Sequence, residues 1–93
     1  MAQGRYLNIF INPKAEFSRE DVEKKINLSI DWFRYNENTY IVYTTSTIDK
    51  WMLRLKPLVE PNGRLFICEM VTTNRNGWMQ KDFWNWLRKK RGN

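Results

Sequence analysis

The amino-acid sequence predicts one domain of the α+β class, and three observations support that prediction. A segment near the N-terminus alternates apolar and polar residues, as a strand with one buried face does. Two later segments place apolar residues at three- and four-residue steps behind a capping pattern, as amphipathic helices do. The chain has 93 residues, 42% of them hydrophobic, so residues 1–93 can bury one core and are too rich in core-forming residues to be disordered.

The first strand and the first helix are predicted within residues 5–30. The segment RYLNIFINP, residues 5–13, is the alternating stretch and predicts a strand. Behind it, Ser18 and Asp21 match a helix N-cap with its capping partner, and acidic residues stand near the positive end of the helix dipole. Apolar residues then recur at helical spacing, which predicts a helix over residues 19–30.

A hairpin is predicted next. The segment DWFRYNENTYIVYTTS, residues 31–46, is rich in aromatic and β-branched residues and is interrupted by the polar string NEN. We therefore expect two strands that meet at a turn near residues 36–38, with a short first arm.

The second half of the chain predicts a helix, a strand and a closing helix. Ser46 and Asp49 repeat the capping pattern, and one apolar stripe follows them: Ile48, Trp51, Met52, Leu55 and Leu58. Pro57 lacks a backbone N–H, so we expect the helix to end or kink near Lys56. The string RLFICEMV predicts the last strand, and the residues from about Gln80 predict a third helix.

The predicted order is β-α-β-β-α-β with a helix appended. This order is typical of the ferredoxin-like split β-α-β fold, in which two helices cover one face of an antiparallel sheet. The other face must then meet water, the third helix or a partner. Because two helices cannot cover both faces of an aromatic-rich sheet, we expect a homodimer that buries strand edges or the open face.

The composition excludes several chemistries. The chain has no histidine, which removes Ser-His-Asp and Cys-His triads and most zinc sites. The single cysteine, Cys68, excludes an intramolecular disulfide, fits a cytoplasmic protein, and lies in a string that predicts a buried strand position. We expect no metal or cofactor, no signal peptide and no membrane span, since the sequence has no run of ~18 consecutive apolar residues.

The net charge of +6 favours a polyanion or an acidic surface as the partner. We expect contact with the RNA or DNA backbone through basic residues of the second and third helices and one indole. These residues are Lys50, Arg54, Lys81, Trp84, Arg88, Lys89 and Arg91.

The closing string GWMQKDFWNWLRKKRGN divides into two stripes at helical spacing. The first is a core-facing seam of Met79, Phe83, Trp86 and Leu87. The second brings basic side chains to an indole, the combination that follows phosphates while stacking a base: Lys81, Trp84, Arg88 and Arg91. Two interpretations of this second stripe stay open, a nucleic-acid contact and a solvated cationic face at a helix C-terminus. The helix as a whole is expected to act as a lid on the core.

Several strings taken together resemble the small SinR-like proteins. These are DWFRY, TSTID, LKP, NGRLF and GW…FWNWL, which lie between residues 6 and 87. SinR-like proteins resemble in fold the VapD and CRISPR-associated adaptation endoribonuclease group. The resemblance implies a ferredoxin-like fold and often a homodimer formed through strand edges.

The resemblance also bears on catalysis. In the nuclease relatives an aspartate ends the first strand and binds the metal, whereas this chain has Ile11 and Asn12 there. Asparagine is neutral and a poor replacement for a carboxylate ligand, so we expect a non-catalytic protein. The alternatives are a metal-dependent endoribonuclease and a protein-interaction module, such as an antitoxin or inhibitor, with an acidic partner.

Overall fold

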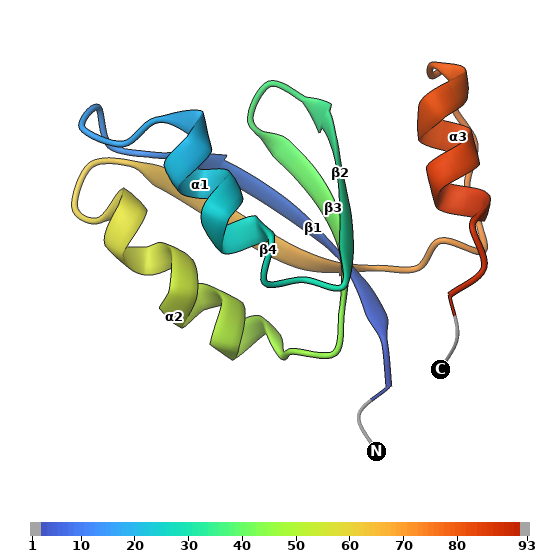
Figure 1. Ribbon diagram of the computed structural model, residues 1–93, viewed down its shortest axis with the longest axis horizontal. Helices are drawn as coiled ribbons and strands as arrows, with labels where there is room; N and C mark the ends of the chain where they lie inside the picture. The colour runs from blue at the N-terminus through green and yellow to red at the C-terminus, as the bar shows by residue number, and fades with distance from the viewer. Residues whose placement is uncertain (1–2, 92–93) are drawn as a thin grey trace.

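The computed structural model describes residues 3–91 and shows an α+β domain with one antiparallel sheet and three helices (Figure 1). The strands are β1 (Arg5–Asn12), β2 (Asp31–Asn36), β3 (Thr39–Thr44) and β4 (Arg64–Met70), in the sheet order β2-β3-β1-β4. The helices are α1 (Arg19–Ile26), α2 (Ile48–Val59) and α3 (Lys81–Arg88). The expected class and the order of elements along the chain are confirmed.

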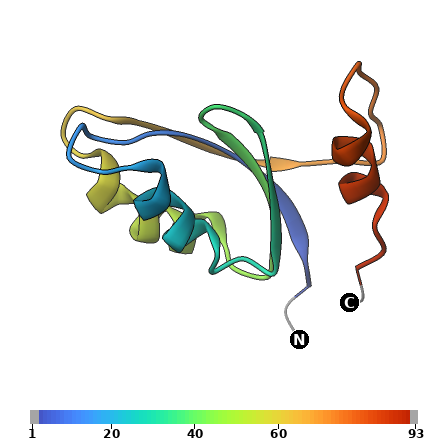
Figure 2. The ribbon, with the colours of Figure 1, turned by 45° about the horizontal axis from the view of Figure 1, so that its top comes forward.

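Alternation along the strands separates two clusters on opposite faces of the sheet. The larger cluster holds Tyr40 and Val42 of β3 together with apolar residues of β1, α1 and α2. Ile41, the residue between them, belongs to the second cluster with residues of α3, because successive strand side chains point to opposite faces. Figure 2 shows α1 and α2 side by side under the sheet, with α3 well separated from them.

The main core lies between the sheet and the pair α1 and α2. The apolar residues of the alternating stretch in β1, Leu7, Ile9 and Ile11, are almost completely inaccessible. Burial of one such side chain contributes roughly 1.5–3 kcal/mol. Trp51 of α2 lies at the centre, where its indole N–H donates to Thr44 Oγ1 at 3.2 Å.

Helix α1 starts as predicted and ends four residues early. The Ser18 Oγ accepts from the backbone N–H of Asp21, whose carboxylate accepts from the N–H of Ser18 at 2.8 Å, so the capping box is confirmed. The helix ends at Ile26 because the Ser29 hydroxyl donates to the Ile26 carbonyl at 2.7 Å. The next apolar residue, Ile30, is exposed, and its N–H donates to Tyr43 of β3.

Two features of α2 differ from the expectation. Its N-cap is Thr47 and not Ser46, since Thr47 Oγ1 accepts from the N–H of Lys50 at 3.2 Å. The helix also continues through Pro57 to Val59. Because Pro57 has no N–H, the Leu53 carbonyl lacks its helical donor; Leu53 itself is 72% exposed.

Three further expectations of the sequence are wrong. Met52 is exposed, and Val59 takes a place in the buried stripe of α2. The first arm of the hairpin is not short, because β2 and β3 have six residues each. Cys68 is exposed, because it points to the face opposite α1 and α2 while its neighbour Ile67 packs against the main core.

Candidate nucleic-acid interface

The closing segment, residues 71–91, places α3 against the face of the sheet that α1 and α2 leave open. Residues 71–80 contain no helix or strand and lead from β4 to α3 (Figure 1). Phe83 and Leu87 of α3 are buried against Ile41 of β3, with partly buried aromatic residues around them. The lid role of this helix is therefore confirmed for the part of the sheet near β2.

The core-facing seam of α3 is confirmed in part. Phe83 packs edge-on against Phe33 of β2, with 5.9 Å between ring centroids, and Trp86 lies 6.0 Å from the same ring. Trp86 is half-buried, and Met79, which precedes the helix, is exposed. The seam consequently runs from residue 83 to residue 87 and does not begin at Met79.

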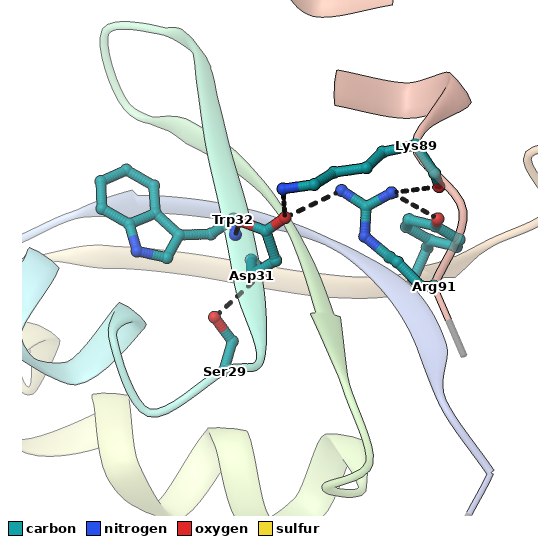
Figure 3. A network of polar contacts seen from close by, with 6 residues as sticks. Ser29, Asp31, Trp32, Lys89 and Arg91 are labelled. Carbon is teal, nitrogen blue, oxygen red and sulfur yellow. Dashed lines mark hydrogen bonds and ion pairs between the residues drawn. The ribbon is translucent and has the colours of Figure 1, made fainter. Parts of the chain in front are cut away.

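Arg91 holds the C-terminal end of the segment. The sequence predicted Arg91 on the exposed basic stripe, but in the structure its side chain is buried. Its side chain is only 7% exposed, and its Nη2 lies 3.0 Å from Asp31 Oδ2 at the start of β2 (Figure 3). The guanidinium carbon lies 4.2 Å from the centroid of a Trp86 ring and 5.6 Å from those of Tyr6 and Tyr43. A guanidinium with these contacts fixes the end of the segment and is not free for phosphate.

Asp31 is the acidic partner of two basic residues, Lys89 and Arg91. We call these three residues the latch. The Lys89 ammonium lies 3.5 Å from the same carboxylate oxygen that Arg91 contacts. Partial burial raises the pKa of Asp31, but the nearby Trp86 indole, the Trp32 backbone N–H, Arg91 and Lys89 outweigh it and leave the pKa below its ordinary value. A lowered carboxylate pKa means that the latch stabilises the folded state near neutral pH and loses this effect only as the pH falls below about 4.

Lys50 and Arg54 do not join the basic residues of α3. Both lie on α2, which covers the opposite face of the sheet. Lys50 is exposed, whereas the Arg54 guanidinium lies 4.7 Å from the centroid of a Trp51 ring and buries its Nη1. Arg54 therefore covers the core tryptophan, and the structure gives two separate basic regions where the sequence predicted one set.

The exposed side of α3 carries Lys81 and Arg88, as predicted. Arg88 donates from Nη2 to Asn85 Oδ1 at 2.8 Å, and Lys81 is exposed at the first helical position. Trp84, expected to stack a base, is partly buried and packs edge-on against Phe83 at 5.1 Å between centroids. Its indole also lies beside Gly77, where an added Cβ would be 3.7 Å from the ring.

A groove of about 460 Å³ lies between β2 and the residues that precede α3. Its lining consists of Phe33, Arg34, Tyr35, Trp78, Met79, Gln80 and Phe83. Trp78, at the rim, is 99% exposed. Sequence reasoning missed this site because Trp78 precedes the helix and belongs to neither of its stripes; an indole outside both stripes was the available signal.

Comparisons with protein-family models, curated proteins and solved structures find no match to this chain. Within residues 3–91, no group of three or more His, Cys, Asp or Glu residues could hold a metal ion. The same residues include no helix that is long and apolar enough to cross a membrane. Asn12 is exposed at the end of β1 opposite Arg64 of β4.

The net positive charge is concentrated in the closing segment. Residues 1–70 carry ten basic and nine acidic residues, whereas residues 71–93 carry six basic residues and one acidic residue. Five of the six net charges therefore belong to a quarter of the chain. The segment that borders the aromatic groove thus also carries most of the net positive charge of the chain.

Proposed function

We propose that this protein is a non-catalytic, cytoplasmic ferredoxin-like domain that binds RNA or DNA through its closing segment. The observation that supports the proposal is the concentration of positive charge on residues 71–91, beside a groove lined by aromatic side chains. Basic side chains supply the phosphate contacts of nucleic-acid binding, and exposed aromatic rings supply stacking surfaces for bases.

The ferredoxin-like assignment is part of this proposal and is supported by how the strands interleave. Helix α1 connects β1 to β2, which lie on either side of β3, and α2 connects β3 to β4, which lie on either side of β1. From the β4 edge the order is β4-β1-β3-β2, and two interleaved β-α-β units are what the name split β-α-β describes. The resemblance to SinR-like proteins rests on the sequence strings alone.

Within the closing segment, the basic residues divide into two roles. Lys89 and Arg91 contact Asp31 and hold the segment on the sheet. Arg75, Lys81, Arg88 and Lys90 are exposed and have no acidic partner at ion-pair distance among the described residues. We assign the phosphate contacts to this second group, with Lys81 and Arg88 on the surface of α3.

The double variant Lys81→Ala with Arg88→Ala tests the phosphate contacts. The slope of log affinity against log salt should flatten by up to ~1.8 for duplex DNA or ~1.4 for a single strand, because two phosphate contacts are lost. The melting temperature should stay nearly unchanged, since exposed substitutions usually alter stability by about 0.5 kcal/mol or less. Fluorescence anisotropy with labelled oligonucleotides across a salt series measures the slope.

The matched control is the double variant Lys24→Ala with Lys25→Ala. Both lysines are exposed in the last turn of α1, on the opposite face of the sheet, and the control removes the same two charges. Its salt slope should equal that of the unaltered chain. Equal flattening in both double variants, or no flattening in either, would count against an interface on α3 and would favour diffuse attraction or an acidic protein partner.

We also propose that the chain forms a homodimer through the edge strand β4. Within residues 3–91 β4 pairs only with β1, so its outer edge presents unpaired backbone groups, and Phe66 beside them is 62% exposed.

Light scattering at micromolar protein should give a mass of about twice 11.4 kDa. Phe66→Lys should shift the protein towards the monomer, whereas Leu53→Lys on exposed α2 surface should not. A monomer mass for the unaltered chain would end this part of the proposal.

A further inference from the structure

We infer that the groove beside Trp78 binds one unpaired nucleobase, so that the protein takes single-stranded nucleic acid in preference to duplexes. This inference rests on the proposed function and names the substrate class of that site. Its residues differ from the predicted stacking residue, since Trp84 is packed against Phe83 and Gly77.

The exposure of Trp78 is the first observation behind this inference. Trp51 is fully buried and the other three tryptophans are partly buried, whereas Trp78 is 99% exposed. Leaving an indole in water forgoes the stabilisation that burial would give. A fully exposed indole at the rim of an aromatic groove is therefore an available surface for a planar ligand.

The groove opposite Trp78 is already formed by rings that hold one another in place. Phe83 contacts Phe33 at 5.9 Å and Tyr35 at 5.8 Å between ring centroids. The Tyr35 hydroxyl donates to Asn8 Oδ1 of β1, which fixes the ring from its far end. Two walls of the groove are thus held by contacts with neighbouring residues, whereas Trp78 is 99% exposed and leaves its ring accessible to a ligand.

The polar groups at the groove suit a nucleotide better than an aliphatic ligand. Gln80 at its end carries an amide that can both donate to and accept from a base edge. Lys81 is the next residue, and Arg75 precedes Trp78 in the same exposed segment. A base in the groove would therefore have cationic side chains available for the phosphates on either side of it.

We expect the groove to favour single strands over duplexes. In a duplex each base is stacked on its neighbours, so its faces are not available to protein rings without unstacking. The groove volume of about 460 Å³ lies within the range of ~300–1,000 Å³ that small-molecule sites occupy. We therefore expect one unstacked base to enter the groove.

The variant Trp78→Ala tests the inference. Affinity for a labelled oligouridine or oligothymidine should fall about 5- to 150-fold, which corresponds to ~1–3 kcal/mol for one stacked base. The salt slope should not change, because no charge is removed, and affinity for a hairpin duplex should stay the same. Trp78→Phe should retain part of the affinity that Trp78→Ala loses. Because Trp78 is almost fully exposed, all these chains should melt at the temperature of the unaltered protein.

Leu53→Ala is the control, because Leu53 is a large exposed apolar residue on α2, away from the groove. If the unaltered chain binds single-stranded and duplex oligonucleotides with equal affinity and Trp78→Ala changes neither affinity, the inference is overturned while the proposed function stands. If the unaltered chain binds no oligonucleotide, the proposed function itself is overturned. If Trp78→Ala instead changes the mass in light scattering and leaves binding intact, the groove holds a second copy of the chain, which also overturns the inference.

Discussion

Trp51→Ala should lower the free energy of unfolding by about 3–5 kcal/mol. The side chain is completely buried at the centre of the main core. Its removal creates a cavity, leaves Thr44 Oγ1 without the indole donor, and takes away the ring that the Arg54 guanidinium covers. Because domains of this size are commonly stable by only about 5–15 kcal/mol, the variant should be partly unfolded at moderate urea concentrations.

Urea and thermal denaturation followed by circular dichroism measure this effect. Leu53→Ala is the matched control from the same helix, since Leu53 is 72% exposed and should change stability by about 0.5 kcal/mol or less. Similar losses in both variants would show that α2 does not pack on the sheet through Trp51.

Arg91→Ala should release α3 from the sheet while the main core stays folded. The substitution removes a guanidinium that contacts Asp31 at 3.0 Å and stacks on Trp86 at 4.2 Å. A desolvated cation–π contact contributes about 2 kcal/mol or more, and we expect a loss of about that size because Lys89 remains beside the partly exposed Asp31. Local opening of this kind is possible because α3 packs in a cluster of its own.

Hydrogen exchange detects this release residue by residue. Amides of α3 should lose protection in Arg91→Ala, whereas those of β1 and β3 should keep theirs. The protection of α3 amides in Arg91→Lys should lie between that in the unaltered chain and that in Arg91→Ala, because an ammonium restores the charge but not the planar stacking of a guanidinium. Unchanged protection of α3 in Arg91→Ala would mean that Phe83 and Leu87 alone hold the helix.

Local patterns predicted the elements well and their ends less well. Side-chain alternation and the Ser18–Asp21 capping box depend on neighbouring residues, so both could be predicted from the sequence. The end of α1 could not, because it depends on the Ser29 hydroxyl and on the pairing of Ile30 with Tyr43 of a distant strand. The exposure of Cys68 likewise depends on how far α3 extends over the open face.

In the candidate site, too, the positions fixed by local helical spacing could be predicted from the sequence, whereas those fixed by distant contacts could not. Lys81 and Arg88 lie within α3, where helical spacing fixes the direction of a side chain, and both are exposed as expected. Arg91 lies beyond the helix, since Lys89 already has an extended ψ of 130°. Its partner, Asp31, is 60 residues away in the sequence. Trp78 precedes the helix, so the same spacing could not place its side chain.

Direct titration of the unaltered chain with a labelled single-stranded oligonucleotide tests the central claim, that the closing segment binds nucleic acid. Four of its basic residues are exposed and have no acidic partner among the described residues: Arg75, Lys81, Arg88 and Lys90. Measurable binding is expected at low salt, and if all four residues contact phosphates the affinity should fall by up to ~50-fold between about 50 and 200 mM salt. No binding at 50 mM salt, or an affinity that does not depend on salt, would contradict the claim.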